Sequence, residues 1–111
     1  MEEALKRAVY NVFMEYNGIS IFEVIIDDHY KCKHPEVNDE IILGLISKLH
    51  MIKRIPMKVV DAYSYFVEEP IYYESKPYRL IFLIEENKSY IGVVNAFRIK
   101  EKKWDFHQKK I

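Results

Sequence analysis

Hydrophobic residues near the start of the chain recur at the spacing of a helix. They are Leu5, Val9, Val12, Phe13 and Tyr16. Side chains three or four positions apart share one face of a helix, so this pattern predicts an amphipathic helix over residues 2–16. Two acidic residues at its beginning suit the positive end of the helix dipole. Asn17-Gly18 suits its end, because both residues tolerate left-handed backbone.

The following residues predict an extended segment and then a second helix. Residues 19–26 are rich in β-branched side chains, which favour strands. A helix is expected to begin after Asn38, an N-cap residue followed by two acidic residues. Val37 and Ile42 are placed for a hydrophobic staple at this end. The expected apolar stripe consists of Ile41, Ile42, Leu45, Ile46 and Leu49.

After Pro56 the pattern changes to strands. Four runs are rich in Val, Ile, Tyr and Phe, namely 58–67, 71–74, 78–84 and 89–99. The breaks between them are short, which favours antiparallel neighbours because a parallel crossover needs about a dozen residues. The sequence thus predicts a single α+β domain over 1–111, with two N-terminal helices packed on a three- to four-stranded antiparallel meander sheet. A basic tail is expected over 100–111.

Alternation along the last predicted strand divides its side chains between two faces. One face is expected to carry Ile91, Val93, Asn95, Phe97 and Ile99, and the other Tyr90, Gly92, Val94, Ala96 and Arg98. Both sets are largely apolar, so one face should pack on the helices and the other should form a binding surface. The nine tyrosines of the chain either fill half-buried sheet positions or stack on bases or a protein partner.

Composition and charge narrow the class of protein. The 111 residues are 50% hydrophobic, and 17 basic residues balance 17 acidic ones, which argues against a general polycation but leaves room for a local basic patch. Cys32 is the single cysteine, so an internal disulfide framework is excluded. No apolar run approaches the ~20 residues that span a bilayer. The expectation is a soluble, cytoplasmic protein with no membrane partner.

Candidate chemistry is densest in the polar segment 27–34. His29, Lys31, Lys33 and His34 combine proton-transfer and phosphate-binding groups. Cleavage of RNA at a ribose needs a base, an acid and cations near the phosphorus, and histidine titrates near neutral pH. The Arg98 guanidinium could clamp two phosphate oxygens. The same segment is also typical of a solvated loop. The remaining expected RNA-binding residues are Tyr90, Lys102, Lys103 and His107.

No metal or cofactor is expected. Asp27, Asp28, His29, Cys32 and His34 include the common metal ligands, but no pair among them has the spacing of a structural zinc site. The sequence also contains no Walker loop, dinucleotide fingerprint, nucleophile elbow or His-Glu-x-x-His motif. Kinases, dehydrogenases, serine hydrolases and zincins are therefore disfavoured.

The predicted order of helices and then a meander resembles the RelE and BrnT group of small bacterial ribonuclease toxins, which have a barnase-like sheet. Some relatives carry a histidine a few residues before a basic residue at the start of a helix. The stretch His29-Tyr-Lys-Cys-Lys-His34, followed by the helix at Asn38, is similar to this arrangement. The segment 90–98, which ends in Arg98, looks like their last core strand.

The resemblance implies a metal-independent endoribonuclease of the toxin–antitoxin type, with a protein antitoxin as partner. His29 would transfer protons, and Lys31 and Arg98 would bind phosphate. Such toxins are usually basic, whereas this chain is neutral and its N-terminal half is acidic.

Two other classes of function stay open. A non-enzymatic binding protein, such as an adaptor, an immunity-type inhibitor or an accessory protein, explains the balanced charge better. A homodimer built by sheet or helix contact would explain why both predicted sheet faces are apolar.

Overall fold

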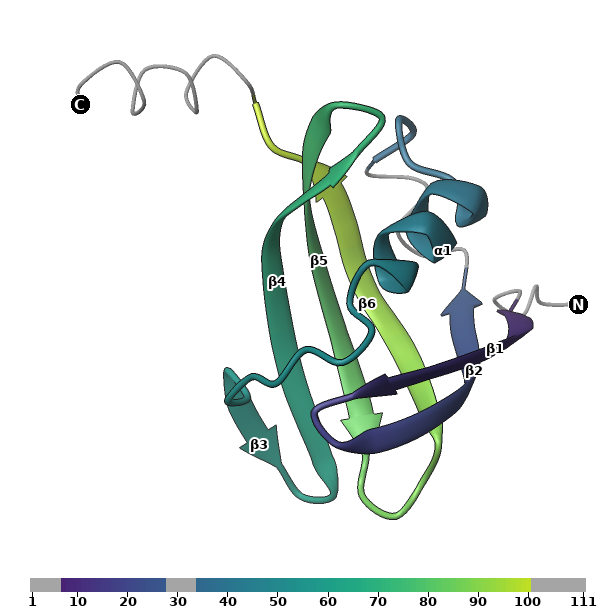
Figure 1. Ribbon diagram of the computed structural model, residues 1–111, viewed down its shortest axis with the longest axis vertical. Helices are drawn as coiled ribbons and strands as arrows, with labels where there is room; N and C mark the ends of the chain where they lie inside the picture. The colour runs from purple at the N-terminus through teal and green to yellow at the C-terminus, as the bar shows by residue number, and fades with distance from the viewer. Residues whose placement is uncertain (1–6, 28–33, 101–111) are drawn as a thin grey trace, which may run out of the picture.

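The computed structural model describes residues 7–27 and 34–100 (Figure 1). Its elements in chain order are β1 (Arg7–Tyr16), β2 (Ile19–Asp27), α1 (Asp39–Ser47), β3 (Lys58–Val60), β4 (Tyr63–Tyr73), β5 (Lys76–Glu85) and β6 (Tyr90–Arg98). The strands form one sheet in the order β1-β2-β6-β5-β4-β3. Neighbours are antiparallel except β2 and β6, which run parallel over three residue pairs.

The predicted fold class is wrong. The described residues form a mostly-β α+β fold with one short helix and a six-stranded mixed sheet, in place of two N-terminal helices on three or four strands. α1 and the loop that leads from it to β3 lie on the viewer's side of β4, β5 and β6, and the β1–β2 hairpin curls over the same side (Figure 1). The opposite face of the sheet carries no helix from the described residues.

β1 occupies most of the segment that was expected to be helical. Its inward side chains alternate: Tyr10 and Val12 pack against the core, and Met14 and Tyr16 are buried in it. Phe13, which the helical spacing placed on the buried stripe, is 87% exposed. Val, Tyr and Phe favour strands, and pairing along β2 satisfies the backbone of this segment.

Asn17-Gly18 forms the turn of the β1–β2 hairpin. The two residues have φ of 56° and 79°, as a tight turn between twisted antiparallel strands requires. The expected left-handed backbone is thus present, but it joins two strands and does not end a helix.

α1 begins where the sequence predicts. The Asn38 side chain accepts a hydrogen bond from the Ile41 amide at 2.8 Å. Val37 and Ile42, expected to form a staple, are both buried. Gly44 lets the Tyr73 ring lie against the helix, because an added Cβ would overlap that ring.

β4 continues through a proline that was expected to break it. The register with β5 shifts between Glu68 and Ile71, and this bulge accommodates Pro70, which has no amide hydrogen to donate. The expected run 58–67 is instead divided by a turn at residues 61–62 into β3 and the start of β4.

A second bulge, at Val94 in β6, corrects the expected faces. Ile81 pairs with Asn95, but Phe82 pairs with Val93, so Val94 is an extra residue and the alternation reverses there. Ile91 and Ala96 are both in the core, although they were expected on opposite faces. Arg98 pairs with the buried Tyr78 and therefore lies on the opposite face of the strand from Tyr90.

The core centres on three aromatic rings and one carboxylate. Tyr16 packs edge-on against Phe66 and Phe82, with both ring centroids at 5.1 Å. Glu68 is the buried charged side chain among the described residues. Its carboxylate accepts hydrogen bonds from the Tyr16 hydroxyl at 2.5 Å and from Arg54 Nε and Nη2 at 2.8 and 2.6 Å. Burial is the main cause that raises the pKa of Tyr16, and the hydrogen bond to Glu68 raises it further.

Candidate functional site

The predicted site residues are only partly within the described ranges. His29, Lys31, Lys33, Lys102, Lys103 and His107 lie outside them, and their roles stay predictions. His34, Tyr90 and Arg98 are described.

His34 and Arg98 lie in one groove at the end of β6. The groove has a volume of about 500 Å³, and its lining residues are His34, Glu36, Glu69, Arg79, Phe97, Arg98, Ile99 and Lys100. The His34 ring stacks on Phe97 with centroids 5.0 Å apart. The Arg79 guanidinium carbon lies 5.5 Å from the centroid of the same ring. The sequence analysis missed Arg79 and Phe97, although alternation in residues 78–84 places Arg79 away from the core.

Carboxylates offset much of the positive charge in this groove. Arg79 binds Glu69 through two hydrogen bonds of 2.6 and 3.0 Å. His34 Nδ1 lies 3.9 Å from a Glu36 carboxylate oxygen. Within the described part of the chain, the lining cations without an ion pair are Arg98 and Lys100. The groove can therefore hold one anionic group beside an aromatic ring.

Tyr90 does not share this groove. It begins β6 and Arg98 ends it, which separates them by about 26 Å along an extended strand. The Tyr90 hydroxyl donates to Glu85 at 2.7 Å. Burial and this bond raise the pKa of Tyr90 to about 12. One nucleotide cannot contact both side chains.

The face of the sheet away from α1, named here the open face, is rich in aromatic and aliphatic side chains. It carries Val9, Ile25, Tyr63, Tyr65, Val67, Ile81, Leu83, Tyr90 and Phe97. The Lys58 ammonium lies 5.1 Å from the centre of the Tyr65 ring. A hollow of about 320 Å³ lies at Gly92, between Tyr63, Leu83 and Tyr90. Such a surface can receive apolar side chains of a partner.

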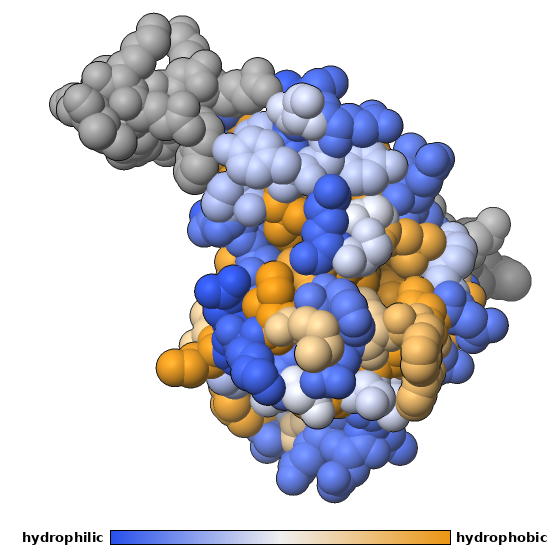
Figure 2. Space-filling model, in the orientation of Figure 1, coloured by the Kyte–Doolittle hydropathy of each residue, from blue (hydrophilic) through white to orange (hydrophobic). Residues whose placement is uncertain are grey.

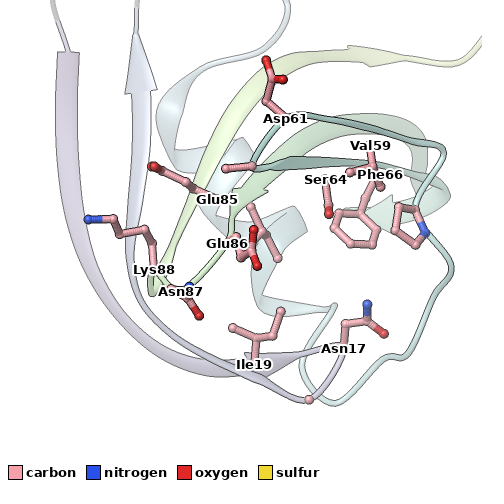
Figure 3. A pocket seen from close by; sticks show the side chains of 14 residues that line it. Asn17, Ile19, Val59, Asp61, Ser64, Phe66, Glu85, Glu86, Asn87 and Lys88 are labelled. Carbon is pink, nitrogen blue, oxygen red and sulfur yellow. The ribbon is translucent and has the colours of Figure 1, made fainter.

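A third hollow lies where the β1–β2, β3–β4 and β5–β6 turns meet (Figure 3). Its volume is about 680 Å³, within the range of small-ligand pockets. Ile19 and Phe66 supply apolar walls, and Glu86 and Asn17 add polar groups to the lining (Figure 3). Its lining residues, all within the described ranges, include no histidine or cysteine. The pocket can hold a small molecule, and its charged lining residues are Asp61, Glu85, Glu86 and Lys88.

The described residues show no metal-binding group. Residues 7–27 and 34–100 contain no cluster of three or more His, Cys, Asp or Glu side chains that could hold an ion. In the same ranges, no helix has the length and apolar character needed to cross a bilayer.

Comparison of the chain with known protein families, curated proteins and solved structures gives no match. The geometry of the described residues is therefore the basis for the function proposed below.

Proposed function

We propose that this chain is a non-enzymatic protein-binding module that pairs with a second copy of itself through the open face. The observation that carries the proposal is the one-sided sheet: α1 packs against β4 and β5 on one side. On the other side no helix from the described residues covers the aromatic and aliphatic side chains, of which Val9 and Tyr63 are exposed and the rest half-buried. An apolar surface of this kind on a small domain marks an interaction site.

The size of the open face suits a stable dimer. Five of the six strands have nine to eleven residues and are about 30 Å long; at about 4.8 Å apart they span about 19 Å, which gives about 600 Å² in projection. Stable interfaces bury about 800 Å² per partner, and a surface of side chains exceeds its projection. Two such sheets would pack face to face as in a β-sandwich.

The charges on the open face also suit a second copy. Arg7 and Lys58 lie on it together with Glu23 and Glu85, and the whole chain has no net charge. Across a twofold axis, one residue of the face meets a different residue of the second copy, and the reverse contact repeats it, so a face with both signs can place opposite charges across the interface. Two neutral copies also experience no long-range repulsion.

Light scattering of the purified chain across a range of concentrations tests this proposal. We expect the wild type to have the mass of a dimer, and Val9→Lys and Tyr63→Lys to be monomeric, because both exposed side chains lie on the open face. Ile55→Lys is the matched control, since Ile55 is exposed in the loop before β3. A monomeric wild type at the highest soluble concentration, or equal masses for all variants, would overturn the proposal.

A second candidate function is the metal-independent endoribonuclease. One observation favours it: His34 and Arg79 both lie against the Phe97 ring, and Arg98 lines the same groove. An imidazole, an unpaired guanidinium and an aromatic ring are groups that can hold a phosphate and stack on a base.

Incubation of the full chain with labelled RNA in chelator tests the ribonuclease proposal. Cleavage should leave a cyclic phosphate and a 5′-hydroxyl, and His29→Ala and Arg98→Ala should each lower the rate by about a hundredfold. Lys76→Ala, an exposed change outside the groove, should cleave like the wild type. Absence of cleavage by the wild type, or equal cleavage by His29→Ala, would exclude this function.

A further inference from the structure

The loop between α1 and β3 exposes large hydrophobic side chains beside lysines. Met51, Ile55 and Met57 are 59%, 87% and 55% exposed, and Val59 in the following strand is 62% exposed. Residues 48–60 contain four Lys or Arg residues and no Asp or Glu. In a chain without net charge, this segment is therefore locally cationic as well as apolar.

Hydrogen bonds fasten this loop to the sheet at both ends. The Met51 amide donates to the Glu15 carbonyl and the Asn17 amide donates to the Ile52 carbonyl, both at 2.7 Å. At the other end, the Met57 amide donates to the Tyr65 carbonyl at 2.7 Å. The exposed side chains are thus held outward by a fixed backbone, and a partner would not have to order them.

Arg54 and the lysines of the loop have different roles. The Arg54 guanidinium is bound to the buried Glu68 carboxylate and anchors the middle of the loop. Lys53, two residues before Ile55, forms no ion pair within the described ranges, whereas Lys58 lies on the open face over the Tyr65 ring. In Figure 2, hydrophobic and charged side chains lie next to one another on the flank where this loop enters β3.

We propose that this segment docks the protein on an anionic lipid surface. Ile55 and Met57 enter the boundary between headgroups and acyl chains, and Lys53 contacts lipid phosphates. Apolar side chains that project singly, with a lysine beside them, match this interface, because acyl chains accommodate any shape and the anionic surface attracts the cation. The expectation of no membrane partner rested on the lack of a spanning segment, which does not bear on surface docking.

Co-sedimentation of the full chain with vesicles tests the proposal. We expect binding to vesicles of phosphatidylcholine with phosphatidylserine to be at least about tenfold stronger than to phosphatidylcholine alone. Ile55→Glu and Lys53→Glu should each abolish most of this binding. Phe13→Glu is the matched control, since Phe13 is also 87% exposed but lies on β1. Equal loss in Phe13→Glu, or no binding by the wild type, would overturn the proposal.

Fluorescence distinguishes insertion from adsorption by charge alone. A tryptophan at the loop tip, Ile55→Trp in a Trp104→Phe background, should shift its emission to the blue on anionic vesicles. Binding without this shift would overturn the insertion of Ile55. Tyr63→Lys should bind vesicles like the wild type, so that failure of the dimer and failure of lipid docking are observed separately.

Discussion

Replacing Arg54 with alanine would remove the cationic partner of the buried Glu68 carboxylate. The chain contains a close control for this change. Arg54–Glu68 and Arg79–Glu69 are both pairs in which one guanidinium makes two hydrogen bonds to one carboxylate. The carboxylate side chain is 4% exposed in the first pair and 37% exposed in the second. Burial of the carboxylate is therefore the main difference between the two pairs.

The expected loss follows from the cost of an unpaired charge. Removing one partner of a fully buried ion pair costs about 3–5 kcal/mol, and a surface pair contributes about 0–1 kcal/mol. Because the Arg54 side chain is itself 49% exposed, solvent screens the pair and the estimate falls to about 2–3 kcal/mol. Arg79→Ala should cost about 1 kcal/mol, including its contact with Phe97.

Urea and thermal denaturation followed by circular dichroism measure both losses. With about 4 °C per kcal/mol for a domain of this size, Tm should fall by about 10 °C for Arg54→Ala and by about 4 °C for Arg79→Ala. The triple variant Tyr16→Phe/Arg54→Met/Glu68→Leu should recover most of the loss, because it leaves neither a buried charge nor the Tyr16 hydroxyl without a partner. Equal losses for the two alanine variants would refute the argument from burial.

Three further changes test the core, the helix start and the response to pH. Phe82→Ala should cost about 3–5 kcal/mol in urea denaturation, because Phe82 is fully buried against Tyr16 and Phe66; a loss below about 1 kcal/mol would contradict this packing. Asn38→Ala should cost about 1 kcal/mol by removing the cap of α1, whereas Asn38→Asp, which keeps an acceptor oxygen, should stay near the wild type. The pKa of Tyr90 is raised to about 12, so its contribution to stability is complete below about pH 10, the ordinary tyrosine pKa, and is lost as the pH rises toward 12. Tyr90→Phe should therefore make Tm fall less steeply over this alkaline range. An unchanged slope would exclude Tyr90 as a source of the pH dependence.

Local signals correctly located α1 and β2. The Asn38 cap, the acidic first turn and the stripe of Ile42, Leu45 and Ile46 act within one or two helical turns, and all are present in the structure. Residues 19–26 are likewise extended, as their β-branched composition indicates. These are features that neighbouring residues determine by themselves.

β1 could not be assigned from spacing alone. Val9, Val12, Phe13 and Tyr16 fit a helical stripe, and Tyr10, Val12, Met14 and Tyr16 fit a strand. The pairing partner β2 decides between them, and Asn17-Gly18 was the local signal for that hairpin. Strand alternation from Val9 to Tyr16 and the turn residues together would have favoured the correct element.

The predicted binding surface depended on a regular last strand. A single extra residue, Val94, moves Arg98 to the face opposite Tyr90. Nothing in the local sequence marks this bulge, since Val94 is an ordinary strand residue and the register with β5 determines it. Glu68 was missed for a related reason. It lies two residues after Phe66 and therefore on the same side of β4, but this holds only if the strand continues through Pro70, and the sequence predicted a break there.

The position of β6 governs the order in which the sheet can be completed. β6 is the last of the six strands to leave the ribosome, yet it lies between β2 and β5 and joins the N-terminal hairpin to the other strands. Until it is synthesised, β1–β2 and β3–β5 are two separate ribbons, each with an unpaired edge where β6 belongs. Assembly of the sheet must therefore wait until β6 has been synthesised, and a nascent chain stalled before Tyr90 would present two unpaired strand edges to chaperones or to its neighbours.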